Sequence, residues 1–309
     1  MRKKVIVDCD NTMGMPYGEI DDGLTLLYLL GRDDIDLVGI TNCYANSSLK
    51  SVEYWTERFL CEIDRTDIPR FSGKPFCGQN CTEWFEKTWG HHFNDEKPDG
   101  SSPSDAAIFL AEQADKYPGQ IHVLALGSMT NLYEAAELDE RFFSNLAEIV
   151  LMGGVHGDLL LNECACVELN LACNPAGAYR VLNNGACPVV IMNANICLQA
   201  PFTEKDMGRI SFWPEGRRRM VREWLGVFGG TFYLWDLLPA VYLSHPELFD
   251  LKSARIASSL SDLERGILVT GDYGAEVTMP DNILDTGRFM DIIQSAWYAA
   301  WQKEKNGSE

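Results

Sequence analysis

The sequence predicts an α/β protein with a mostly parallel central sheet flanked by helices on both faces. Short apolar segments alternate with segments of helical periodicity along the 309 residues, which is the order of successive βαβ units. The apolar segments carry Val, Ile and Leu at consecutive rather than alternate positions, as is typical of strands that are buried on both faces. No repeat or low-complexity linker divides the chain, so we expect one domain over residues 1–309.

The apolar segments predict five core strands and the periodic segments predict five helices between them. We expect strands at residues 4–9, 35–41, 121–126, 148–152 and 188–193, and helices at residues 23–30, 51–63, 106–116, 132–136 and 175–183. Because each pair of strands is separated by a segment long enough for a helix, neighbouring strands run parallel. Ligands of such sheets bind beyond the carboxyl ends of the strands, where we expect the active site.

One long segment, residues 72–104, does not fit the alternation of strands and helices. It is rich in Gly, Pro and Asn, yet it also carries Trp84, Phe85, Trp89, His91 and His92. A long irregular segment in a compact domain is usually functional or disordered, and the aromatic residues argue against disorder. We therefore expect a lid over a pocket, with an aromatic surface for self-association as the alternative.

The charge of the chain restricts its partners. Lys and Arg number 26 against 45 Asp and Glu, a net charge of −19, which disfavours binding to nucleic acid or to an anionic membrane surface. The run Arg217–Arg219 is expected to be a solvated helix face. No apolar stretch has the length of a signal peptide core or a membrane span, and the ten cysteines lack zinc-site spacing. We expect a cytoplasmic protein with reduced thiols.

Acidic and amide residues follow the predicted strands where a ligand would bind. Asp8 and Asp10 close the first strand, Asn46 follows the second, and Glu168 and Asn170 follow the fourth. A group of carboxylates without a lysine among them cannot be buried in ionised form unless a cation compensates the charge. Oxygen ligands of this kind suit calcium or magnesium rather than zinc.

The first strand allows two interpretations. The segment Asp8-Cys-Asp10-Asn-Thr12 resembles the signature of haloacid-dehalogenase-like phosphatases, which implies Asp8 as nucleophile and Asp10 as general acid over magnesium. Residues 271–276, Gly-Asp-x3-Glu, resemble a later metal-binding motif of that family. That interpretation leaves Asp21 and Asp22 unexplained and lacks a phosphate-binding lysine after a convincing strand.

The second interpretation uses more of the chain. Asp8-x-Asp10 followed by Asp21-Asp22 resembles the Asp-x-Asp-x3-Asp-Asp signature of the inosine–uridine nucleoside hydrolase family. Four later segments resemble further motifs of that family, in the same order: Ala-Leu-Gly-Ser-Met-Thr-Asn at 125–131, Ile-Val-Leu-Met-Gly-Gly at 149–154, Glu-Leu-Asn with a following Asn-Pro at 168–175, and Trp-Asp-x3-Ala at 235–240. The resemblance implies a Rossmann-like nucleoside hydrolase fold and hydrolysis of the N-glycosidic bond of ribonucleosides.

The resemblance also implies a calcium site and a catalytic base. Asp10, Asp22 and Asp236 would hold Ca2+, together with the backbone carbonyl of Thr130. These groups, water and two ribose hydroxyls fill the six to eight positions that calcium takes. Asp10 would accept the proton of the attacking water, and Asp8 would support the loop from behind.

Five further residues are implied in substrate binding. Asp21 and Asn46 would bind ribose hydroxyls, Glu168 and Asn170 would lie near the 5′ end, and Met152 would contact the ligand. Because a missing hydroxyl leaves a buried acceptor unpaired, such a site would require ribose. Taken singly, Asn46 is equally well explained as a helix cap and Met152 as strand core.

The sequence departs from the family pattern in two places. Residues 11–20 make the loop between Asp10 and Asp21 longer than is usual in the family. Trp235 stands where many members carry a histidine, as in the purine-specific inosine–adenosine–guanosine branch. There the purine lies between two tryptophans, which favours its protonation; Trp84 matches the position of the second. Acid catalysis by His91 or His92 is the alternative.

A non-catalytic protein that binds a nucleoside or calcium is the remaining interpretation. The pocket residues would serve binding equally well, but a binder has no need of a base such as Asp10 beside the metal. The resemblance implies a homo-oligomer, a dimer or tetramer, and a nucleoside as the small-molecule partner. The base itself, common or modified purine or pyrimidine, stays open.

Overall fold

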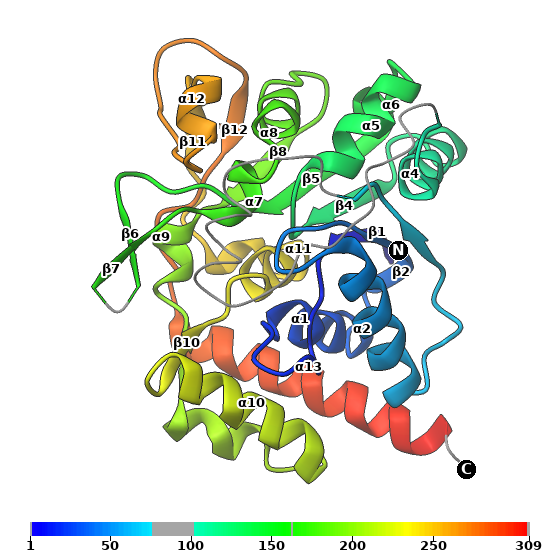
Figure 1. Cartoon of the computed structure of the whole chain (residues 1–309), viewed down its shortest axis with the longest axis vertical. Helices are drawn as coiled ribbons and strands as arrows, with labels where there is room; N and C mark the ends of the chain where they lie inside the picture. Colours follow the sequence, from blue (N-terminus) through cyan, green and yellow to red (C-terminus); the bar gives the residue numbers. More distant parts are fainter. Residues whose placement is uncertain (1, 76–101, 162, 308–309) are drawn as a thin grey trace.

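An eight-stranded sheet forms the centre of the part of the chain that the computed structural model describes, residues 2–75, 102–161 and 163–307 (Figure 1). In spatial order its strands are β11 (Ser253–Arg255), β12 (Glu276–Thr278), β8 (Val189–Met192), β5 (Leu146–Met152), β4 (Ile121–Ala125), β1 (Lys3–Cys9), β2 (Ile35–Asn42) and β3 (Arg70–Ser72). All neighbours pair in parallel except β11 and β12, which are antiparallel. The predicted mostly parallel sheet and its five core strands are confirmed.

Helices cover both faces of the sheet (Figure 1). On one face lie α4 (Asp105–Lys116), α5 (Thr130–Leu138), α6 (Phe142–Asn145), α8 (Pro175–Leu182) and α12 (Leu260–Leu263). On the other lie α1 (Asp21–Leu30), α2 (Leu49–Glu62), α10 (Glu215–Val227), α11 (Leu237–Ser244) and α13 (Thr286–Gly307). The five predicted helices are confirmed, each with bounds that shift by a few residues.

Alternate residues of each central strand face opposite cores, as the period of a strand requires. In β1, Val5 and Val7 pack with α1 and α13, whereas Ile6 packs with the α4 and α5 side. In β5, Val150 and Ile149 divide in the same way. Because both parities are apolar, the strands read as continuous hydrophobic runs, which is why the sequence predicts a parallel sheet.

The remaining elements are short and lie around the carboxyl edge of the sheet or connect the larger ones. They are α7 (Leu169–Ala172), α9 (Ala194–Cys197), the 3-10 helices η1 (Glu204–Ile210) and η2 (Pro246–Leu248), and two hairpins, β6 (Leu159–Leu161) with β7 (Cys164–Cys166) and β9 (Pro201–Thr203) with β10 (Thr231–Tyr233). Strands of three residues carry little periodicity, so the sequence does not predict them.

The predicted lid, residues 72–104, lies mostly outside the described residues. Ser72 ends β3, and the Ser104 side chain caps α4 by accepting a hydrogen bond from the Ala107 amide. Trp84, His91 and His92 are among the residues that are not described.

The prediction that Arg217–Arg219 is a solvated helix face is wrong for Arg217. Arg217 lies in α10, and its side chain is buried. It donates to both carboxylate oxygens of Glu304 in α13, at 3.1 and 3.2 Å. Glu62 of α2 lies 3.5 Å away, and Trp213 stacks on the guanidinium. The apolar periodicity of α10 does not reveal a buried cation, because its partners lie far away in the sequence.

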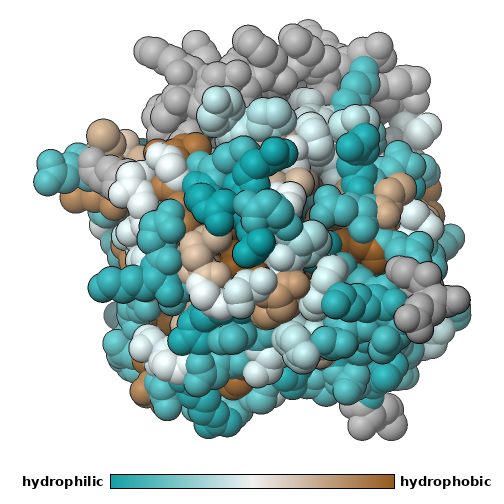
Figure 2. Space-filling model, turned by 90° about the horizontal axis from the view of Figure 1, so that it is seen from below, coloured by the Kyte–Doolittle hydropathy of each residue, from teal (hydrophilic) through white to brown (hydrophobic). Residues whose placement is uncertain are grey.

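Hydrophilic residues cover most of the face in Figure 2, which looks at the molecule from below in the view of Figure 1, where α10 and α13 lie. Among the described residues, no helix combines the length and the apolar character that crossing a bilayer requires.

The close approach of α1 and α13 provides a test of the packing. A Cβ added at Gly31, which follows α1, would lie 1.9 Å from the carbonyl oxygen of Ala296. We expect Gly31→Ala to lower the free energy of unfolding by about 2–3 kcal/mol, since the two helices must separate. Urea unfolding measures the change. The control is Gly216→Ala in α10, where the new Cβ meets nothing within 4 Å; equal stability of the two variants would contradict the tight contact.

Candidate metal and substrate site

Asp8 lies at the end of β1, where its neighbours on both sides hold it in place. One of its carboxylate oxygens accepts hydrogen bonds from the Thr41 hydroxyl of β2 at 2.6 Å and from the Asn131 amide of α5 at 2.7 Å. Asn131 also donates to the carbonyl of Asn42. Asp8 therefore ties the ends of β1 and β2 to the start of α5.

Asp10 and Asp22 are linked through Asn46. The backbone amide of Asn46 donates to Asp10 Oδ2 at 2.6 Å, and its side-chain amide lies 3.5 Å from Asp22 Oδ2. Asp10 and Asp22 are fully buried, and Asn46 is 8% exposed. The loop after β2 therefore holds Asp10, which follows β1, close to Asp22 of α1.

Three helices begin at this edge of the sheet. Asp21 and Asp22 form the first turn of α1, Asp236 directly precedes α11, and Thr130 opens α5. The N-terminus of a helix carries partial positive charge, which partly offsets the buried carboxylates. One oxygen each of Asp21, Asp22 and Asp236 lies within 4.8 Å of the others.

Burial dominates the electrostatics of these acids. Desolvation raises the pKa of Asp8 and Asp21 to about 7 and that of Asp10 to about 8. It also raises the pKa of Asp22 and Asp236 well above the ordinary range, and the neighbouring carboxylates raise both further. Without a compensating charge, the cluster holds protons near neutral pH.

The donor set fits a hard divalent cation. Asp10 Oδ1 and Asp22 Oδ1 are buried and have no hydrogen-bond partner within the described residues. Buried oxygens that lack a donor are costly unless a cation or water satisfies them. Carboxylates in this number are ligands that calcium and magnesium prefer.

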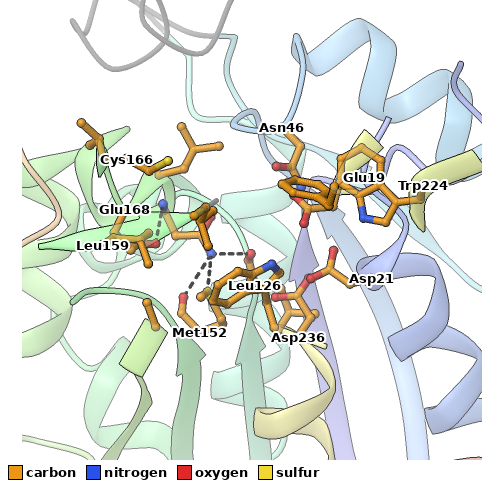
Figure 3. Close-up of a pocket in the computed structure, with 17 residues that line it drawn as sticks. Glu19, Asp21, Asn46, Leu126, Met152, Leu159, Cys166, Glu168, Trp224 and Asp236 are labelled. Atoms are coloured by element: carbon orange, nitrogen blue, oxygen red, sulfur yellow. Dashed lines mark hydrogen bonds between the residues drawn. The ribbon is translucent and has the colours of Figure 1, made fainter. Parts of the chain in front are cut away.

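A cavity opens directly above the acids (Figure 3) and encloses about 810 Å3 of space, part of it open to solvent. Its lining includes six residues that the sequence predicts at the site: Asp21, Asn46, Met152, Glu168, Asn170 and Asp236. Trp235, predicted beside the leaving base, lines it as well.

Glu168 and Asn170 lie on the side of the cavity nearest β5. Glu168 caps α7, because its two oxygens accept from the Asn170 amide at 2.9 Å and the Leu171 amide at 3.1 Å. The side-chain amide of Asn170 donates to the carbonyls of Leu126 and Met152. Burial raises the pKa of Glu168 to about 7, against the lowering effect of the backbone amides.

Four of the predicted site residues are not among those that line this cavity: Asp10, Asp22, Thr130 and Trp84. Asp22 belongs to the close group of carboxylates with Asp21 and Asp236, whereas Asp10 does not. The hydroxyl of Thr130 accepts a hydrogen bond from the Asn174 side-chain amide at 3.0 Å and lies 3.2 Å from the Tyr44 hydroxyl. Its role as a carbonyl ligand stays a prediction. Trp84 lies outside the described residues.

Several residues that line the cavity do not follow from the sequence pattern. Glu19 belongs to the long loop after Asp10. Trp224 lies in the last turn of α10, and Phe228 directly follows that helix. The rings of Trp224 and Phe228 are 4.9 Å apart, edge to face. An aromatic pair four residues apart shortly before Trp235 is the signal that could have pointed to this wall. The apolar residues of the β6–β7 hairpin, also in the lining, carry no such signal.

The second half of the phosphatase pattern lies apart from the acids. Asp272 is exposed in a loop, and Glu276 of β12 is exposed and pairs with Arg255. Three strands, β8, β5 and β4, separate β12 from β1 in the sheet, so these two acids do not form one site with Asp8 and Asp10.

Comparisons with known proteins agree on one family. The sequence profile described as inosine-uridine preferring nucleoside hydrolase matches residues 5–306. The chain is 28% identical to uridine nucleosidase 1 of Arabidopsis thaliana over 81% of this chain and 76% of the relative. It is 24% identical to the pyrimidine-specific ribonucleoside hydrolase RihA of Shewanella woodyi, over 95% of this chain and 97% of the relative. Among solved structures, the purine-preferring ribonucleoside hydrolase from Gardnerella vaginalis superimposes with a TM-score of 0.79. The match covers 96% of this chain and 99% of that chain, at 20% sequence identity.

The buried acids predict how stability depends on pH. In metal-free protein the pKa values of Asp8, Asp10 and Asp21 are about 7–8, above the roughly 4 of the unfolded chain. The unfolded state therefore releases these protons first, and the free energy of unfolding falls as pH rises from about 4 to 8. Thermal melts in EDTA should show this fall, and calcium should raise the melting temperature by about 5 °C or more at pH 8 and by less at pH 5.

Asp21→Asn removes one of the buried charges and should flatten the pH dependence in EDTA. The exposed Asp272→Asn is the matched control and should leave it unchanged. A melting temperature in EDTA that does not vary from pH 5 to 8 would contradict the raised pKa values of these carboxylates.

Proposed function

The chain belongs to the inosine-uridine preferring nucleoside hydrolase family, and from this premise we propose that it hydrolyses purine ribonucleosides in a calcium-dependent reaction. Membership makes it an enzyme that cleaves the N-glycosidic bond of ribonucleosides. The observation that carries the proposal is the cavity that joins the buried acids to the aromatic side chains of Trp224, Phe228 and Trp235.

Asp10, Asp22 and Asp236, with the carbonyl of Thr130, would hold the calcium ion. When bound, calcium supplies positive charge that offsets the buried carboxylates and lowers the pKa of a water molecule. The unpartnered Asp10 Oδ1 would accept a proton from that water. The amide of Asn46, which donates to Asp10 Oδ2, would keep this carboxylate oriented while the proton moves.

The ribose would lie over the acids. Asp21 and Asn46 would accept from and donate to its two ring hydroxyls, whereas Glu168 and Asn170 would face its 5′ end and Met152 its underside. Hydrolysis passes through an oxocarbenium-like ribose, and the carboxylates around the ring would stabilise the positive charge that develops there. The cavity walls would exclude bulk water.

The base would stack on Trp235. Trp84, in the segment that is not described, would be the second ring of a sandwich, and Trp224 and Phe228 would close the side. A purine gains more stacking area than a pyrimidine, and a ring that gains a proton as it leaves is favoured between π faces. Relatives are named for uridine or pyrimidine, and one solved structure is named purine-preferring, so the proposed preference rests on these rings.

The lid, the oligomeric state and the location of the enzyme belong to the same proposal. Residues 72–104 would serve as a lid of the single domain, and the active form would be a cytoplasmic homo-oligomer, a dimer or tetramer. A nucleoside hydrolase has no need of nucleic acid or membrane as a partner.

Base release tests the reaction. Inosine, adenosine, guanosine, uridine and cytidine are incubated with the enzyme in EDTA and again after calcium is restored. We expect release of free purine only with calcium, and a loss of about 1,000-fold in kcat for Asp10→Ala, since a general base contributes 10²–10⁴-fold. Asp272→Asn should retain full activity. Phosphate release from a generic phosphoester without any base release would favour the phosphatase interpretation, and nucleoside binding without turnover would favour a binding protein.

The aromatic wall has its own test. Trp235→Ala should lower kcat/KM for inosine by about 10- to 100-fold and for uridine by less, because stacking of this kind is worth about 1–3 kcal/mol per base. Trp235→Phe keeps a ring and should restore most of the loss. If both variants lose equally on purine and pyrimidine, Trp235 has a structural role only.

A further inference from the structure

The loop of residues 11–20 is closed by its own hydrogen bonds. The Thr12 hydroxyl donates to the backbone carbonyl of Glu19 at 2.9 Å, so the two ends of the loop lie together. Within the loop, the Met15 amide donates to the carbonyl of Thr12 at 2.9 Å and the Gly18 amide to that of Met15 at 3.0 Å. Compact loops that are held by their own groups are frequently functional. The backbone that carries Glu19 is therefore held in place.

Glu19 places a carboxylate in the cavity. Its side chain lines the cavity together with Asn46 and Trp224, and Figure 3 shows these three on the side opposite Glu168. Among the described residues, the carboxylate of Glu19 has no hydrogen-bond or ion-pair partner. It is therefore available to a ligand.

The cavity holds more negative charge than one metal ion offsets. Asp10 and Asp22 are buried next to the carboxylates that line it, which number four: Glu19, Asp21, Glu168 and Asp236. A calcium ion carries two positive charges, and the helix starts at this edge of the sheet add only part of one each. The cavity therefore keeps a negative potential, which attracts a positively charged ligand.

Aromatic side chains share the cavity with Glu19 and suit the same kind of ligand. Trp224, Phe228 and Trp235 all belong to the lining, and the rings of Trp224 and Phe228 meet edge to face at 4.9 Å. A cation over the face of an aromatic ring is attracted by the negative charge of the π system. A carboxylate and aromatic rings together recognise a flat cation better than a flat neutral ring.

We propose that Glu19 selects nucleosides whose base carries a permanent positive charge, and that N7-methylated purine ribonucleosides are the preferred substrates of this class. The ribose would lie over the acids, as in the proposed function, with the charged base among the rings and beside Glu19. The inference rests on the proposed nucleoside hydrolysis and specifies the base for the same site.

A positively charged base also simplifies the reaction. The bond between C1′ and N9 breaks, and its electron pair stays on N9, which neutralises the ring. Water adds its hydroxyl group to C1′ and gives its proton to Asp10. The products are ribose and a neutral 7-methylpurine, so no side chain has to protonate the leaving base.

The test compares purines that differ only by the methyl group on N7. The calcium-loaded enzyme is assayed with guanosine and 7-methylguanosine at pH 6, where the methylated ring is positively charged. Because N7-methylation weakens the glycosidic bond in any enzyme, two purines without ribose, 9-methylguanine and 7,9-dimethylguanine, are added as inhibitors that are not cleaved. We expect the inhibition constant of 7,9-dimethylguanine to be about tenfold lower than that of 9-methylguanine, a factor typical of a cation held among aromatic rings. We expect 7-methylguanosine to exceed guanosine in kcat/KM by at least as much.

Variants of Glu19 separate its charge from its shape. Glu19→Gln keeps the shape and should abolish the tenfold difference between the two inhibition constants, whereas Glu19→Asp keeps the charge and should retain most of it. Glu140→Gln is the matched control, because Glu140 is exposed and does not line the cavity, and it should leave the difference unchanged. Equal differences in Glu19→Gln and Glu140→Gln would overturn the proposal.

Failure of the inference is distinguishable from failure of the proposed function. Cleavage of guanosine, with inhibition by 7,9-dimethylguanine no stronger than by 9-methylguanine, overturns the selection of a charged base and leaves hydrolysis intact. If neither nucleoside is cleaved, the proposed hydrolysis is contradicted. Calorimetric affinities for the two methylated guanines then decide the inference alone, and tighter binding of 9-methylguanine overturns it.

Discussion

The burial of several carboxylates at one edge of the sheet is the constraint on which the rest of the site depends. Asp8, Asp10, Asp22 and Asp236 are at most 3% exposed, and desolvation of this kind disfavours their charged forms. The fold offsets part of the cost with the starts of α1, α5 and α11 and with donors from Thr41, Asn46 and Asn131. The oxygens left without partners define where a cation would complete the charge balance.

The parallel sheet makes this concentration of acids possible. Strands that run parallel end at the same edge, so residues from distant parts of the sequence meet there without any long connection across the core. Separate sets of helices cover the two apolar faces of the sheet. At the carboxyl edge, the side chains belong to loops and helix starts and are not constrained by packing in either core.

Much of this arrangement could be predicted from the sequence, and the limits have physical reasons. The five core strands and their helices follow from long apolar runs, and the acids follow from their position after those runs. Trp224 and Phe228 do not follow from the sequence, because α10 returns to the site from far along the chain and an aromatic pair at helical spacing is equally typical of a core. The burial of Arg217 does not follow from the sequence either, because Glu304, its partner, lies 87 residues away. The three-residue strands of the hairpin are too short to carry a pattern.

Arg217 also connects the helix that carries Trp224, at the edge of the cavity, to the C-terminal helix, which does not line the cavity. It is buried in the same helix as Trp224, two turns earlier, and its partner Glu304 belongs to the last helix of the chain. Removal of one member of a buried ion pair is strongly destabilising, because the other charge stays unpaired. The C-terminal helix thus anchors the aromatic wall mechanically. Loss of Glu304 would therefore be expected to disturb the Trp224 side of the cavity, although no residue of α13 lines it.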